Sequence, residues 1–81
     1  MNVKVLFFAR AKELAGRANI EVAMGDEATV GDLKQLLIEQ HPEMEELLQF
    51  SVVSVDRKVA NDDHVIYHGA EVGILPPVSG G

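Results

Sequence analysis

Short segments of alternating or helically spaced apolar residues follow one another along this chain. Residues 3–8 (VKVLFF) are β-branched or aromatic at most positions, which is typical of a strand. Successive side chains of a strand point to opposite faces. One face would carry Val3, Val5 and Phe7, and the other would carry Lys4, Leu6 and Phe8. Both faces of this first strand are therefore largely apolar.

The next two segments predict a short helix and a second strand. Residues 9–15 (ARAKELA) suit a helical turn, and Gly16 suits the left-handed position that ends many helices. Residues 20–24 (IEVAM) then alternate, with the larger apolar side chains on one side. The connection between the two strands is short enough for them to pair antiparallel.

The clearest helix begins after Thr29. The Thr29 side chain can cap the first turn, and Asp32 can complete a capping box in which Asp replaces the usual Glu or Gln. The apolar residues that follow at helical spacing are Val30, Leu33, Leu36 and Leu37. Pro42 ends this helix, because the residue before a proline avoids the helical region.

The second half of the chain predicts one more short helix and three more strands. The apolar positions of the helix are Met44, Leu47 and Leu48. Strands are expected at residues 51–55, 58–60 and 71–75, with a turn at residues 61–63.

These elements predict an α+β fold with one mixed sheet. Two hairpin-forming stretches flank one main helix, which has to cover one face of the sheet to bury its leucines. This element order commonly places the first and last strands side by side and parallel at the centre of the sheet. The arrangement is the ubiquitin-like β-grasp. We expect a β-grasp domain at residues 1–75, followed by an extended C-terminal tail at residues 76–81.

Composition excludes several kinds of site. The chain has 81 residues, enough for one domain with a thin core. It contains no cysteine, which excludes disulfide scaffolds, thiolate zinc sites, cysteine-bound iron–sulfur clusters and cysteine nucleophiles. The lack of any disulfide in so small a domain also favours a cytoplasmic location.

Charge and hydropathy narrow the range of partners. No apolar run approaches the roughly 18 residues that cross a bilayer, and the N-terminus does not resemble a signal peptide. We therefore expect no contact with membranes. The net charge of −6 disfavours binding to nucleic acid, whose phosphates would repel the chain. An acidic surface suits basic protein partners, although in many domains it serves only solubility.

The end of the chain carries the candidate chemistry. The tail consists of Pro76, Pro77, Val78, Ser79, Gly80 and Gly81. The two prolines cannot continue a sheet ladder and favour an extended path, so the tail would leave the domain in a set direction. The two glycines have no side chains and would fit a narrow channel in a partner. The alternative is a frayed terminus with no function.

The α-carboxylate of Gly81 is the group that such a tail would deliver. A carboxylate is a poor electrophile and needs activation, most simply as an acyl-adenylate formed with ATP. No segment matches the G-x-x-x-x-G-K-[ST] pattern of a phosphate-binding loop. We therefore expect a separate activating enzyme to use the ATP, and no cofactor to be bound by this chain.

Both ends of the chain resemble the small, sulfur-carrier subunit of molybdopterin synthase. The most specific segments are residues 5–10 (VLFFAR), 13–16 (ELAG) and 76–81 (PPVSGG), within a resemblance that covers the whole chain. It implies a ubiquitin-like fold and a role as sulfur carrier in molybdenum cofactor biosynthesis. Gly81 would be adenylated by a ubiquitin-activating-type adenylyltransferase, converted to a thiocarboxylate, and used to donate sulfur to cyclic pyranopterin monophosphate.

The same resemblance implies the partners. The large synthase subunit would hold the substrate and supply the catalytic side chains, in a heterotetramer of two small and two large subunits. This chain would then be a sulfur donor without catalytic side chains of its own. The sequence departs from the family pattern at residues 68–71, at Leu75 and at Asp56. These departures affect the expected contacts with partners and not the chemistry of the terminus.

Leu6, Phe8 and Leu75 would lie on the sheet face that the main helix leaves uncovered. An exposed apolar patch usually marks an interface, so we expect this one to contact the large subunit and the activating enzyme in turn. Loops could instead fold over this face and bury it. Arg57 and Lys58 could meet an acidic rim of a partner or simply be solvated.

The other polar candidates suit structural roles better. His64 and His68 have the spacing of metal ligands on one helical turn, but the residues between them predict a strand or loop, where the rings do not converge. Asp62 and Asp63 suit a turn better than an acid–base pair, and His41 suits the end of a helix. We predict no metal site.

Two alternative functions stay open. A sulfur carrier for thiamine synthesis or transfer-RNA thiolation would share the fold and the Gly-Gly end, although the Pro-Pro-Val-Ser segment, the Phe-Phe strand and the length favour the molybdopterin synthase carrier. A ubiquitin-like binding module with no chemistry at its end is the other alternative. Such a module would support no pyrophosphate exchange with ATP and an activating enzyme.

Overall fold

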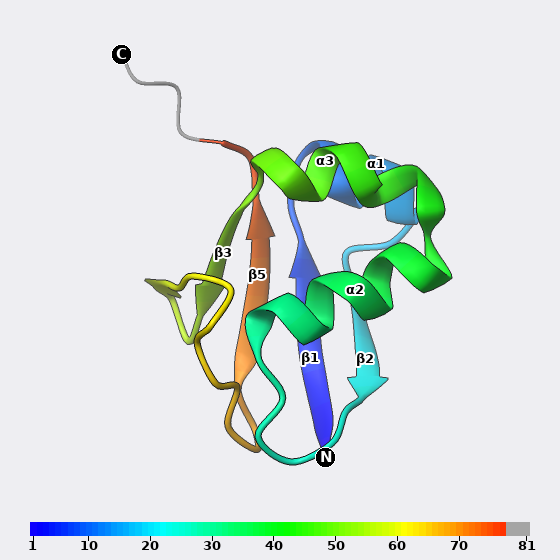
Figure 1. The fold of residues 1–81 in the computed structure, drawn as a ribbon. Helices are drawn as coiled ribbons and strands as arrows, with labels where there is room; N and C mark the ends of the chain where they lie inside the picture. Colours follow the sequence, from blue (N-terminus) through cyan, green and yellow to red (C-terminus); the bar gives the residue numbers. More distant parts are fainter. Residues whose placement is uncertain (78–81) are drawn as a thin grey trace.

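The computed structural model describes residues 1–77, in which nine helices and strands are assigned (Figure 1). Val78, Ser79, Gly80 and Gly81 lie outside the described residues. The elements are β1 (Asn2–Phe7), α1 (Arg10–Ala15), β2 (Asn19–Ala23), α2 (Val30–Gln40), the 3-10 helix η1 (Pro42–Met44), α3 (Glu45–Phe50), β3 (Val52–Val55), β4 (Lys58–Val59) and β5 (Glu71–Leu75).

The strands form one mixed sheet in the order β2-β1-β5-β3-β4. The two central strands, β1 and β5, are parallel, and Val5 pairs with Val72 in their register. The β1–β2, β3–β4 and β3–β5 pairs are antiparallel. The predicted α+β fold with parallel first and last strands is therefore confirmed.

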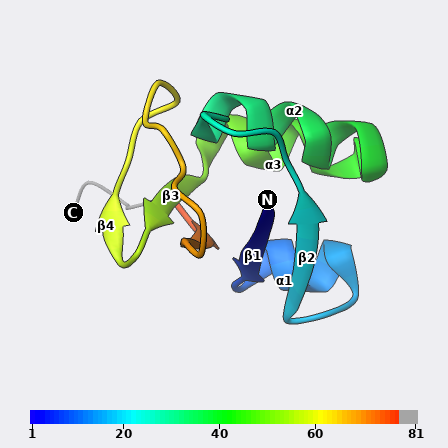
Figure 2. The same ribbon diagram turned by 90° about the horizontal axis from the view of Figure 1, so that it is seen from below.

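The core lies between the sheet and the helices α2 and α3, which pack on the same side of it (Figure 2). Alternation along β1 explains which side chains enter the core, because Val3, Val5 and Phe7 are buried whereas Lys4 is exposed. The other fully buried large side chains are Val30, Leu33, Leu37, Met44, Leu48, Ile66, Val72 and Ile74. Among the described residues, no helix has the length and apolar character needed to cross a membrane.

The ends of the helices follow the sequence signals. Gly16 adopts a left-handed conformation with φ 75° after α1, as predicted. His41, just before Pro42, is the C-cap of α2. The predicted strand at residues 51–55 begins one residue later, because the Ser51 hydroxyl donates to the Leu47 carbonyl oxygen (2.8 Å) and so belongs to the end of α3.

The loop between β4 and β5 is fixed to the start of α2. The backbone N–H of Gly31 donates to the Asp62 carbonyl oxygen (2.9 Å), and the Asp62 carboxylate pairs with Lys34 Nζ (2.7 Å). The N–H of Asp63 donates to Asn61 Oδ1 (3.1 Å), which forms the predicted turn. The first turn of α2 thus has hydrogen-bond acceptors from both its own cap and a distant loop.

The capping box at Thr29 stabilises the start of α2 through two hydrogen bonds. The Asp32 N–H donates to Thr29 Oγ1 (3.2 Å), and the Thr29 N–H donates to Asp32 Oδ2 (2.9 Å). Thr29→Ala removes one of these bonds and should lower the free energy of unfolding by about 1 kcal/mol in urea denaturation. Thr29→Ser, the matched control, keeps the hydroxyl and should lose much less. Equal losses in both variants would contradict the role of the cap.

Candidate functional site

The tail begins at the centre of the sheet, at the end that lies near α1 and α3 (Figure 1). β5 ends at Leu75, which pairs with Val52 of β3, and Pro76 and Pro77 follow outside the ladder and are exposed. The predicted chemical group, the carboxylate of Gly81, lies outside the described residues together with Val78, Ser79 and Gly80. The roles of these residues stay predictions. The boundary between the domain (residues 1–75) and the tail (residues 76–81) also stays a prediction.

An open groove lies on the sheet face that α2 does not cover, and we call it the outer groove. The residues that line it come from the strands β1, β3 and β5, from the position just after β1, and from the β3–β4 hairpin. The lining residues are Leu6, Phe8, Ser54, Arg57, Val59, Glu71, Gly73 and Leu75. The structure thus brings together the three apolar residues of the predicted interface, Leu6, Phe8 and Leu75.

The apolar side chains of the outer groove are open to solvent. The Phe8 side chain is 43% exposed and Val59 is 78% exposed, while Leu6 and Leu75 are half-buried. Loops among the described residues therefore do not bury this face. A contiguous exposed apolar surface of this kind usually marks a contact with another protein. The identity of the protein that makes this contact stays a prediction.

Gly73 forms the floor of the outer groove. It pairs with Leu6 of β1 and with Ser54 of β3 in the sheet register. A Cβ atom at this position would lie 2.7 Å from Ser54 Oγ and 3.5 Å from Cε2 of Phe8. The missing side chain therefore leaves room for the Phe8 ring and the Ser54 hydroxyl. Sequence reasoning missed this residue, although a glycine inside a strand often marks such a close approach.

The β3–β4 turn fixes one rim of the outer groove. Asp56 and Arg57 both have positive φ angles, 49° and 71°. The Asp56 carboxylate accepts a hydrogen bond from the Glu71 N–H (3.0 Å), and the Asp56 N–H donates to the Glu71 carbonyl oxygen (2.8 Å). This turn is thereby tied to the start of β5, and Arg57 lines the groove while Lys58 is exposed nearby.

The histidines lie apart from the outer groove. His64 and His68 are exposed and lie in the loop before β5, outside any helix. His41 lies at the end of α2, with its Nδ1 atom 3.5 Å from Glu43 Oε1. Over residues 1–77, no group of three or more His, Cys, Asp or Glu side chains is arranged to hold a metal ion.

Comparison with known proteins identifies the family. The ThiS family matches residues 5–81. The chain belongs to the ThiS family. Among relatives, the molybdopterin synthase sulfur carrier subunit of Chlamydomonas reinhardtii is 34% identical over 83 residues and covers all of both chains. The protein of the same name from Escherichia coli (strain K12) is 37% identical, covering 98% of this chain and 99% of that one. The predicted resemblance is therefore confirmed.

Solved structures agree on the fold. SAMP1 from Haloferax volcanii superposes with a TM-score of 0.87 at 28% identity, covering 100% of both chains. A complex of subunits 1 and 2 of the molybdopterin-converting factor from Helicobacter pylori 26695 matches over 100% of both chains with a TM-score of 0.72. At 23% identity, that second match is evidence for the fold alone.

The crowding at Gly73 can be tested with a double-mutant cycle. Replacing a strand glycine by alanine ordinarily stabilises a protein by about 0.5–1 kcal/mol. We expect Gly73→Ala to give this gain in a Ser54→Ala background, where the hydroxyl 2.7 Å from the new Cβ is gone. In the wild-type background the gain should be smaller, because the Ser54 hydroxyl has to move. Equal effects in the two backgrounds, measured by urea denaturation, would contradict the close approach.

Proposed function

We propose that this chain is the sulfur carrier of a molybdopterin synthase and that the sulfur is held as a thiocarboxylate on Gly81. The main support is that the match to the ThiS family runs to residue 81 and that the relatives named as sulfur carrier subunits match over the whole chain. The carboxylate oxygen of Gly81 attacks the α-phosphorus of ATP and releases pyrophosphate. Sulfide from a sulfur donor then attacks the acyl carbon, expels AMP and leaves the thiocarboxylate.

The described part of the chain fits a carrier that depends on its partners for catalysis. Nothing in residues 1–77 has the arrangement of a metal site, and no phosphate-binding loop is present in the sequence. The activating adenylyltransferase therefore supplies the ATP site. The large synthase subunit holds cyclic pyranopterin monophosphate and the catalytic side chains, in a complex of two small and two large subunits. We place this reaction in the cytoplasm.

The outer groove is the surface by which the carrier docks. Its exposed apolar residues are Phe8, just after β1, and Val59 of β4, and the half-buried Leu75 connects it to the base of the tail. A partner that covers the groove would therefore hold the tail at its start. In this proposal the large subunit and the activating enzyme cover the groove at different times.

The relatives' names favour molybdenum cofactor synthesis over the other carrier functions. The two sequence relatives are molybdopterin synthase subunits, whereas ThiS is a wider family. A second candidate function comes from a structural neighbour at 26% identity, which is described as small archaeal modifier protein 1. After conjugation of Gly81 to a lysine, trypsin would leave residues 59–81 attached to the target peptide, because Lys58 is the last lysine or arginine in the sequence. Peptide mass spectrometry would detect this added mass.

Deletion of Gly81 tests the terminal chemistry. The wild-type protein, incubated with ATP, the activating enzyme and a sulfur donor, should gain mass by the difference between one sulfur and one oxygen atom, on the C-terminal peptide. The deletion should abolish this species and leave the thermal unfolding midpoint unchanged, because among the described residues none beyond Ile74 belongs to the core. If the deletion variant still supports molybdopterin synthesis, the carrier function is wrong.

Substitution of Phe8 tests the outer groove. Phe8→Glu places a charge among apolar groove residues and should weaken binding to the large subunit at least about tenfold, as measured by calorimetry. Tyr67→Glu is the matched control, because Tyr67 is also exposed (70%) but lies in the loop before β5. Unchanged affinity in a folded Phe8→Glu variant would remove the outer groove from the interface.

A further inference from the structure

A second apolar groove lies at the base of the tail, between α1 and α3, and we call it the α1–α3 groove. Its apolar lining consists of Leu14 from α1, Leu47 and Phe50 from α3, and Pro77. Leu14 and Leu47 pack against the core, whereas Phe50, the last residue of α3, is 64% exposed. An exposed Phe at a helix end adds nothing to the core, so its side chain is available for contact with another molecule.

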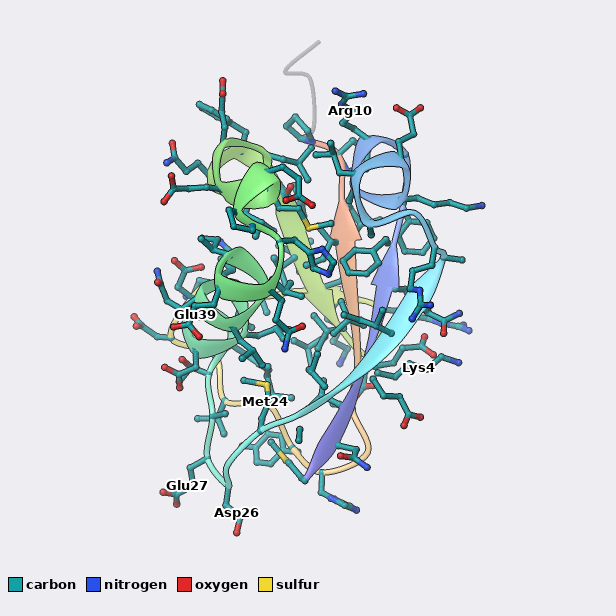
Figure 3. All side chains as sticks on the ribbon, turned by 90° about the vertical axis from the view of Figure 1, so that its right-hand side faces the viewer. Lys4, Arg10, Met24, Asp26, Glu27 and Glu39 are labelled. Atoms are coloured by element: carbon teal, nitrogen blue, oxygen red, sulfur yellow. The ribbon has the colours of Figure 1, made fainter. Side chains whose placement is uncertain are left out.

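The α1–α3 groove is distinct from the outer groove. Leu75 lines the outer groove, whereas Pro77, two residues further on, lines the α1–α3 groove. In Figure 3 the end of β5 lies between α3 and α1. The base of the tail therefore passes between two apolar surfaces. A protein that encloses the base of the tail is therefore close to both of them.

The rim of the α1–α3 groove has an excess of negative charge. Arg10 contributes the positive charge, but its Nη1 atom already pairs with Glu13 Oε2 at 3.0 Å (Arg10 is labelled in Figure 3). Glu43 and Glu46 stand on the η1–α3 wall of the groove, and both are exposed. An occupant with apolar side chains next to lysine or arginine would complement this rim.

We propose that the α1–α3 groove docks a basic, amphipathic segment of the enzyme that activates the tail, an inference that rests on the proposed function. The four residues from Val78 to Gly81 span at most about 14 Å. When the Gly81 carboxylate meets ATP, the groove therefore lies close to the site that binds the triphosphate. Such a site is rich in lysine and arginine, because these side chains neutralise phosphate charge. The acidic rim of the groove is complementary to that surface.

Two variants of the α1–α3 groove test this inference. Phe50→Ser removes the exposed apolar anchor, and Glu46→Lys reverses one rim charge. With the activating enzyme, ATP and labelled pyrophosphate, each should raise the KM for the carrier about tenfold. The effect of Glu46→Lys should shrink as salt is added, since salt screens exposed charges. Tyr67→Ser, which removes an equally exposed aromatic side chain at the other end of β5, should leave the KM unchanged.

The possible outcomes separate this inference from the proposed function. Circular dichroism should show that both groove variants are folded, as expected for exposed positions. Wild-type pyrophosphate exchange with unchanged KM in both variants would overturn the α1–α3 groove as a docking site and leave the carrier function intact. An absence of exchange with the wild-type protein would overturn both. If Phe50→Ser weakens only binding to the large subunit, or only self-association, another occupant fills the groove and the proposal is wrong.

Discussion

The parallel pairing of β1 with β5 joins the two ends of the chain at the centre of the sheet, and the arrangement of the molecule depends on it. The register runs from Lys4 opposite Glu71 to Phe7 opposite Ile74. Parallel strands need a long crossover connection, and here the intervening residues supply α2 and α3, which cover one face of the sheet. The same pairing brings Phe8, just after β1, next to Gly73 on β5. The outer groove thus depends on contacts between residues that are far apart in the sequence.

Charge is distributed unevenly over this scaffold. Residues 26–46, which include α2 and the start of α3, contain seven acidic residues and only one basic residue, Lys34. Figure 3 shows Glu39 on the side of α2 and Lys4 on the opposite side of the sheet. Two different surfaces therefore face solvent: an acidic helical layer, and a mixed outer face that carries the outer groove. Partners with different charge can in this way approach the same tail from different sides.

Local signals in the sequence were sufficient for most of the fold. The cap at Thr29, the glycine after α1 and the proline after α2 act within one or two turns of the chain, and their structural consequences could be predicted. Likewise, alternation along residues 3–8 separated the core side of β1 from its outer side. The parallel order of the central strands followed from the sequence of elements and from the resemblance to a known family.

The details of the two grooves could not be predicted in the same way. The role of Gly73 depends on Ser54 and Phe8, which are neighbours only after β1, β3 and β5 have paired. The α1–α3 groove depends on the packing of two helices whose residues are more than 25 positions apart in the chain, so that no local pattern connects Leu14 with Phe50. Residues 78–81 lie outside the described part of the chain, and their predicted chemistry rests on sequence and family.

The position of β5 also affects how the protein responds to mechanical load. This strand is hydrogen-bonded to β1 on one side and to β3 on the other. Tension along the strand axis would act on both ladders in shear, so that several hydrogen bonds would have to break together before β5 could move. A pull on Pro76, which directly follows this strand, would therefore leave the rest of the domain folded.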